Sequence, residues 1–260
     1  MKDVKTFVTM TELIHGLPFS QRFALVKFGG GITAMSGSIA GNTFARNRYG
    51  SYVRARTKPV NVDSALQQEV RTVIAFLADR WAQTLTGVQR TAWNDYAAAV
   101  GMKNKLGETI HLSGFNHYIR SNSYVKRRAE TLYDDGPTDF TLPAQDPTLE
   151  ITTEVHEQRF NIHFDDTMDW TSETGAWLFM LQGKPQNPQR NFFAGPYKGV
   201  KDKAGDDGDG PTTPEQSTNL WVVAEGQKVW YQLRIQRADG RLSEPWTVQS
   251  TVVAGPLPPP

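Results

Sequence analysis

The spacing of apolar residues changes once along this chain, and that change constrains the fold more than any other feature. After Asp63, apolar residues recur at the spacing of one face of an α-helix, at Leu66, Val70, Val73, Ile74, Leu77 and Trp81. From about Asp134 onward they alternate with polar residues, as half-buried strands do. Because helices and strands bury residues with different periods, the sequence predicts an α+β multidomain chain in which a helical segment precedes a strand-rich C-terminal region.

Three helices are expected within residues 63–133. The first follows Asp63, a favourable N-cap residue. The second begins at Thr86, because Thr86 and Gln89 have the spacing of a capping box, and the third begins at Ser113. A small three-helix domain buries little apolar surface, so we expect it to pack on another part of the chain or on another subunit.

About seven short strands are expected between residues 148 and 254, divided by Gly, Pro and Asp turns. This pattern is typical of an antiparallel β-sandwich. Residues 134–147 are interpreted as a linker and residues 255–260 as a proline-rich tail. The strand candidates are Ile151–Val155, Phe160–Phe164, Ala176–Gln182, Phe192–Tyr197, Leu220–Ala224, Val229–Gln236 and Thr247–Val253.

The end of this region resembles a fibronectin type III domain. The residues that carry the resemblance are Tyr231-Gln232-Leu233-Arg234-Ile235-Gln236, Asp239-Gly240 and Leu242-Ser243-Glu244-Pro245. The resemblance covers roughly residues 146–254 and implies an immunoglobulin-like sandwich. There are two departures: Phe160 or Phe164 stands where the family usually has a tryptophan, and the loop over residues 198–215 is long.

The formal net charge of +1 hides a strong division of charge. Residues 1–133 hold 18 Lys and Arg against 8 Asp and Glu, a net charge of +10. Residues 134–260 hold 10 against 19, a net charge of −9. The sequence therefore predicts one basic and one acidic end.

Much of the positive charge lies in residues 1–62, which we interpret as a basic, Gly- and Arg-rich β-ribbon arm. Between Glu12 and Asp63 there is no acidic residue, and arginines outnumber lysines five to two. Arginine forms bidentate contacts with carboxylates and phosphates, so an anionic partner is expected. A solvated ribbon whose cations prevent edge-to-edge aggregation is the alternative. The candidate partner-binding residues are Arg46, Arg48, Arg54, Arg56 and Lys58.

The turn between the two arginine groups decides which face each group occupies, because side chains alternate along a strand. A three-residue loop over residues 49–51 would pair Arg48 with Tyr52 and place all five cations on one face. A two-residue loop over residues 49–50 would pair Arg48 with Ser51 and divide them. The sequence leaves both registers open.

Residues 30–128 are similar to an uncharacterised structural protein type of tailed phages and prophages. In that type a glycine–arginine ribbon leads into helices, often followed by an immunoglobulin- or fibronectin-like module. The resemblance implies a virion-associated structural role and brings no catalytic residues. It rests on the segments Ser36–Phe44, Arg46-Asn47-Arg48, Arg54–Asn61, Thr86–Ala97 and Leu112–Asn116.

No pattern in the sequence predicts an enzyme or a cofactor. The chain has no cysteine, and the motifs of phosphate loops, serine hydrolases and HExxH zinc enzymes do not occur. No apolar run approaches the roughly 20 residues of a membrane-spanning helix, so no membrane partner is expected. Clustered carboxylates make a weak calcium-site candidate, although we favour a solvated loop, at Asp202, Asp206, Asp207 and Asp209.

Tryptophans are frequent in the acidic half, and at least one is expected to face outward. Exposed indole rings mark protein interfaces or carbohydrate platforms. The candidates for such a surface platform are Trp170, Trp221 and Trp246.

Our leading functional hypothesis is a non-enzymatic structural component of a phage-like virion. It would assemble through its basic arm and its acidic sandwich, as a capsid decoration (cement) or head–tail connecting protein. Its partners would be other virion proteins and copies of itself, and its location the virion. One alternative is an adhesion or glycan-binding module displayed on a particle. Another is a nucleic-acid-binding protein that uses residues 46–58.

Overall fold

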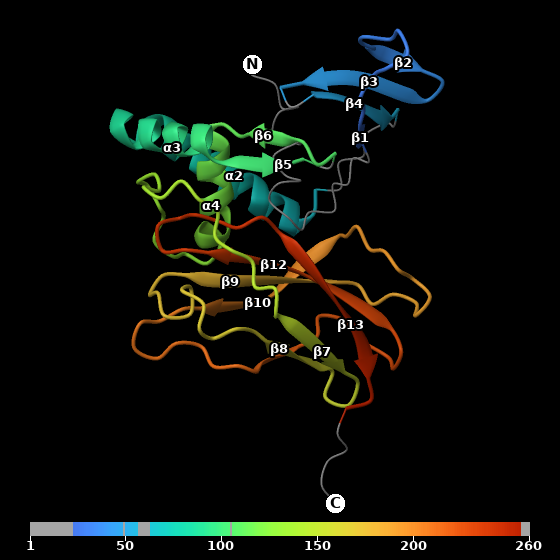
Figure 1. The fold of residues 1–260 in the computed structure, drawn as a ribbon, viewed down its shortest axis with the longest axis vertical. Helices are drawn as coiled ribbons and strands as arrows, with labels where there is room; N and C mark the ends of the chain where they lie inside the picture. Colours follow the sequence, from blue (N-terminus) through green and yellow to red (C-terminus); the bar gives the residue numbers. More distant parts are fainter. Residues whose placement is uncertain (1–22, 49, 57–62, 105, 256–260) are drawn as a thin grey trace, which may run out of the picture.

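The protein was analysed as a computed structural model that describes residues 23–48, 50–56, 63–104 and 106–255. The described chain is an α+β protein with three helices and a large mixed sheet. Figure 1 shows the helices between a small sheet, formed by the N-terminal part, and the large sheet, formed by the C-terminal part. The order of helices before strands in residues 63–255 agrees with the sequence prediction.

The three expected helices are present as α2 (Ala65–Gln83), α3 (Gly87–Ala99) and α4 (Gly114–Arg127). The capping box predicted at Thr86 and Gln89 is formed, and Ser113 caps α4. The N-cap predicted at Asp63 is wrong. Ser64 caps α2, and it forms its own capping box with Gln67. Asp63 has a positive φ of 49° and instead forms an ion pair with Arg71.

Helix α4 is central to the fold, since most of its residues are buried. One side contributes Tyr118 and Ile119 to a core shared with α2 and α3, where Trp93 is fully buried. A short hairpin, β5 (Gly101–Lys103) and β6 (Thr109–His111), joins α3 to α4. The other side of α4 contacts the large sheet, so the helices pack on another part of the same chain, as we expected.

The large sheet has the order β10-β9-β12-β13-β7-β8-β11. All pairs are antiparallel except β13 with β7, which is parallel, so the expectation of a purely antiparallel arrangement is wrong. Its two end strands approach each other, because Lys201 and Lys203 of β10 both pair with Glu215 of β11. The strands are β7 (Glu150–Glu154), β8 (Arg159–His163), β9 (Trp177–Gly183), β10 (Tyr197–Ala204), β11 (Glu215–Thr218), β12 (Lys228–Gln236) and β13 (Trp246–Val253).

Two strand candidates are misplaced. Strand β10 lies at residues 197–204 rather than 192–197, and β11 lies at 215–218 rather than 220–224. These strands end the sheet and expose many side chains, so apolar alternation marks them poorly. The first part of the long loop expected over residues 198–215 therefore belongs to strand β10, which ends at Ala204. The connection from β10 to β11 covers residues 205–214.

Strand β12 shows how the sheet and the helices are joined. Its alternate residues Val229, Tyr231, Leu233 and Ile235 face the apolar core of the large sheet. The intervening Trp230, Gln232, Arg234 and Gln236 are buried as well. Trp230 stacks on Phe193, and Gln236 donates to the Ser121 carbonyl oxygen of α4. This face of β12 is therefore buried inside the protein, although its polar residues are typical of a face exposed to solvent.

Residues 134–147, interpreted as a linker, are fastened to the helices at their start. Asp134 pairs with Arg80, and its carbonyl oxygen accepts a hydrogen bond from Trp93 Nε1 at 3.0 Å. A Cβ added at Gly136 would lie 2.6 Å from the backbone of Ala92 and Trp93. This connection therefore lies tightly against α3.

Within the part of the chain that the structure describes, no helix has the length and apolar character needed to cross a membrane.

Candidate functional site

The described part of the predicted basic ribbon, residues 23–48 and 50–56, forms the small sheet. Its strands are β1 (Phe23–Leu25), β2 (Gly37–Ile39), β3 (Asn42–Asn47) and β4 (Gly50–Ala55), in the order β1-β4-β3-β2. Residues 1–22 and 57–62 of the predicted arm lie outside the described residues. None of the side chains described within residues 25–56 is buried. A salt bridge of 2.5 Å between Lys27 and Glu108 ties this sheet to the β5–β6 hairpin. The hydrogen bond from Lys27 is the largest cause of the lowered pKa of Glu108.

The β2–β3 connection explains part of the glycine content of this region. Ile39 pairs with Asn42, so the loop consists of two residues. Ala40 and Gly41 both have positive φ angles, of 45° and 82°. This is the backbone of a type I′ turn, whose twist matches that of the strands it joins.

The β3–β4 register differs from both registers that the sequence left open. Asn47 pairs with Gly50 and Arg46 with Ser51, so Arg48 lies in the turn. Both registers that the sequence left open placed Gly50 in the loop. In the structure Gly50 is instead the first residue of β4, where it has a positive φ of 128° that other residues rarely adopt.

This register distributes the candidate cations around the ribbon rather than on one face. Arg54 pairs with Thr43, and Arg56 donates its backbone N–H to Gly41, so these two arginines share a face. Arg46 lies on the opposite face. Arg46, Arg48 and Arg56 are exposed and Arg54 is half-buried, whereas Lys58 lies outside the described residues.

The face that carries Arg46 also carries apolar side chains. Phe44 pairs with Val53 directly across β3 and β4, and both are half-buried. Ile39, at the end of β2, is 59 % exposed. An apolar surface beside a guanidinium is typical of protein interfaces, where arginine and aromatic residues are enriched.

The acidic half of the chain has a complementary surface at one end of the large sheet. The β8–β9 loop (residues 164–176) and the β10–β11 loop (residues 205–214) pack together, with Asp206 N–H donating to the Thr171 carbonyl at 3.0 Å. The two loops contain no Lys or Arg. We call these two loops the acidic loops. Their acidic residues are Asp165, Asp166, Asp169, Glu173, Asp206, Asp207 and Asp209.

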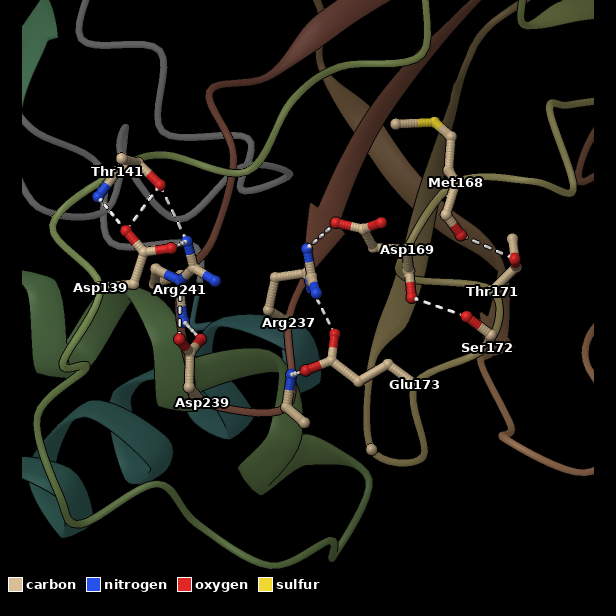
Figure 2. A network of polar contacts seen from close by, with 12 residues as sticks. Asp139, Thr141, Met168, Asp169, Thr171, Ser172, Glu173, Arg237, Asp239 and Arg241 are labelled. Atoms are coloured by element: carbon tan, nitrogen blue, oxygen red, sulfur yellow. Dashed lines mark hydrogen bonds and ion pairs between the residues drawn. The ribbon is translucent and has the colours of Figure 1, made fainter.

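Part of this negative charge is neutralised by the turn between β12 and β13. Figure 2 shows Arg237 between Asp169 and Glu173, and Arg241 between Asp139 and Asp239. Sequence reasoning missed this network. No local pattern could reveal it, because Arg241 and Asp139 lie 102 positions apart.

The calcium-site candidate is not supported by the positions of its residues. Asp202 lies on β10 and pairs with Arg128 at the end of α4, and burial is the largest cause of its raised pKa. Asp206 accepts a hydrogen bond from Gly208 N–H within its own loop. Within the described residues, no group of three or more His, Asp or Glu side chains could hold a metal ion.

The tryptophan platform is wrong for Trp170, which is only 2 % exposed and packs against Phe164 with ring centroids 5.4 Å apart. Trp246 is half-buried and packs against the core of the large sheet. Trp221 is also half-buried, with Lys198 Nζ 5.7 Å from its ring centroid. The three side chains therefore do not form one exposed aromatic surface.

Comparisons with known proteins add little. No protein-family model and no curated protein sequence matches the chain. A family 76 glycoside hydrolase from a bovine Bacteroides thetaiotaomicron strain is similar over 43 % of this chain and 20 % of that protein, with 15 % identity and a TM-score of 0.28. The adhesin domain of Epf from Streptococcus pyogenes is similar over 45 % and 35 %, with 10 % identity and a TM-score of 0.27. Likeness at this level identifies no function.

Proposed function

We propose that this chain is a non-enzymatic assembly protein that binds an acidic protein surface through its basic small sheet. The observation that carries this proposal is the exposure of that sheet. Its described residues include no acid and no buried side chain, yet they form four paired strands. A sheet of this size is normally stabilised by covering an apolar face, so a partner is expected to supply the cover.

A protein partner is favoured over a nucleic acid by the composition of the two faces. Arg46 lies beside Phe44 and Val53, while Arg54 and Arg56 lie on the other face. Cations on both faces and at the turn suit a ribbon that is enclosed by carboxylates. A nucleic-acid site would be better served by a single continuous basic surface along the phosphates.

The assembly that we propose is a phage-like virion, in which the chain is a capsid decoration or head–tail connecting protein. Support comes from the sequence resemblance over residues 30–128 and from the division of charge. The basic sheet of one copy would contact the acidic loops of the next, or a similar acidic surface on another virion protein. Such head-to-tail contacts build rings and lattices.

We also propose that the large sheet is a fibronectin type III-like sandwich. Its strands divide into β7-β8-β11 and β10-β9-β12-β13, which is the arrangement expected of two facing sheets. Tyr231, early in β12, lies in the buried core, and its hydroxyl oxygen is 3.0 Å from that of Thr153.

The test uses the full chain with Arg46, Arg48 and Arg56 each replaced by Glu. The matched control replaces the exposed Lys103, Lys184 and Lys198 by Glu, which changes the net charge equally. Sedimentation velocity should show self-association of the wild type that weakens with salt, little association of the ribbon variant, and near-normal association of the control.

Two further measurements decide between the hypotheses. Mass spectrometry of purified particles should find the protein in them. DNA affinity that falls steeply with salt and is lost in the ribbon variant would instead support the nucleic-acid alternative. A ribbon variant that assembles like the wild type, on itself and into particles, would overturn the proposal.

A further inference from the structure

One stripe of α4 holds the helices on the large sheet. His117, Arg120 and Tyr124 recur at spacings of three and seven residues, so they share a face of the helix. Arg120 Nη1 donates to the Leu242 carbonyl oxygen at 2.6 Å, and Nη2 donates to that of Ser243. Tyr124 stacks on Phe179 of β9, with ring centroids 4.7 Å apart.

The rest of this contact is also polar. Gln236 of β12 donates to the Ser121 carbonyl oxygen at 2.8 Å. Arg128 pairs with Asp202 of β10 and lies over the ring of Trp177, 4.3 Å from its centroid. The contact between α4 and the sheet is thus held by the buried hydrogen bonds of Arg120 and Gln236 and by one partly exposed ion pair. A contact of this kind is sensitive to any new buried charge.

His117 lies at the N-terminal end of the stripe, one turn before Arg120. Its side chain is fully buried, and neither ring nitrogen has a hydrogen-bond partner within the described structure. The groups that face it are Tyr96 of α3, whose ring centroid is 5.0 Å away, Arg120 of α4 and His111 of β6. The charges of Arg241, Asp139 and Asp239 affect the pKa of the neighbouring Tyr96.

These surroundings accept a neutral imidazole but disfavour a charged one. Burial, followed by the positive charge of Arg120 and by His111, lowers the pKa of His117 to about 3. Protonation would place an imidazolium beside the guanidinium of Arg120, which already bonds to the sheet. Release of α4 from the sheet would uncover the helix face that carries both groups.

We propose that the contact between α4 and the large sheet is an acid-sensitive latch, which opens when His117 takes up a proton. The helices would then separate from the sheet while the strands remain paired. None of the groups that form the latch belongs to the basic small sheet, so the proposal does not rest on the partner-binding surface proposed above. In an assembly, it would let mild acid change the shape of each subunit.

The expected size of the effect follows from proton linkage. The docked state is favoured above the ordinary histidine pKa, and its advantage is lost as pH falls from about 6.5 toward 3. With an ordinary pKa in the released state, the docking equilibrium weakens about 25-fold between pH 7 and pH 5. Asp202 titrates with the opposite sign, because its pKa is raised in the folded state, so it cannot cause this loss.

Hydrogen exchange of the full chain at pH 7 and pH 5, corrected for intrinsic rates, tests the latch. Residues 114–127, which lose their contact with the sheet, should lose about 25-fold in protection in the wild type, while the paired strands at residues 150–163 and 228–236 keep theirs. His117→Phe, which is similar in size and does not titrate, should remove the pH dependence. His163→Phe, at an exposed histidine, should retain it.

A second measurement covers the case in which His117→Phe does not fold. NMR titration of the wild-type imidazoles should show His117 taking up its proton only together with the loss of α4 protection. A His117 that titrates near its ordinary pKa while α4 stays protected would overturn the proposal. So would equal loss of protection in residues 150–163, or an unchanged pH dependence in His117→Phe.

Discussion

Arg120 Nη1, in α4, lies 2.6 Å from the carbonyl oxygen of Leu242, although 122 positions separate the two residues. Both residues are buried, and the second guanidinium nitrogen serves Ser243 in the same way. The arginine thus satisfies two backbone carbonyls between β12 and β13 that the helix shields from water. This contact joins the helical part of the chain to the β part.

We expect Arg120→Met to lower the free energy of unfolding by about 2–4 kcal/mol, because it leaves two buried carbonyls without donors. Arg127→Met is the matched control. It removes a largely exposed ion pair with Glu69 and should cost less than about 1 kcal/mol. Urea denaturation of both variants measures the difference, and equal midpoints would contradict this role of Arg120.

The contact between Gly136 and α3 makes a second prediction. Gly136→Ala should destabilise the protein by about 1–3 kcal/mol, since the new methyl group would meet backbone atoms of Ala92 and Trp93 that cannot move aside. At Gly87, in the first turn of α3, an added Cβ meets nothing within 4 Å. Gly87→Ala should therefore be neutral or stabilising by up to about 1 kcal/mol. Thermal unfolding compares them, and a tolerated Gly136→Ala would refute the close packing.

Trp170 and Trp221 allow a core tryptophan to be compared with one near the surface. Trp170→Ala should cost about 3–5 kcal/mol, because a fully buried indole leaves a cavity. Trp221→Ala removes a half-buried ring under Lys198 and should cost clearly less. Urea unfolding measures both costs. A glycan array tests the hypothesis of a carbohydrate platform. Binding of the wild type to a sugar that is abolished in Trp221→Ala would support that hypothesis.

Alkaline pH should destabilise the protein. Burial raises the pKa of Tyr96, Tyr133 and Tyr197 to about 12, above the ordinary value of 10. The folded state therefore holds these protons more tightly than the unfolded state does. Stability is unaffected below about pH 10 and falls as the pH rises toward 12. Phenolate absorbance should appear together with the loss of tertiary circular dichroism.

Two tyrosine variants check this interpretation. The Tyr96 hydroxyl has no hydrogen-bond partner within the described structure, so Tyr96→Phe should reduce the alkaline loss at little cost near neutral pH. The Tyr197 hydroxyl donates to the Phe193 carbonyl at 3.1 Å, so Tyr197→Phe should also cost about 1 kcal/mol near pH 7. Phenolate formation well before unfolding would show that these rings are accessible.

The candidate site was predicted from the sequence in composition but not in geometry. The absence of acids among the described residues 23–56 and the strand pairing of residues 42–55 follow from local patterns. The face of each arginine does not, because a shift of one residue at the turn moves a side chain to the other side of the sheet. Gly50 suited a loop in the sequence, yet it begins a strand.

The sequence by itself determined the local secondary structure. The capping box at Thr86, the apolar stripe of α2 and the alternation in β12 depend on residues within a few positions, so their spacing is visible in the chain. Only the tertiary structure decided which polar groups leave water. Arg120 and Gln236 look like surface residues in sequence and are buried because α4 lies on β12, a contact between segments more than 100 positions apart.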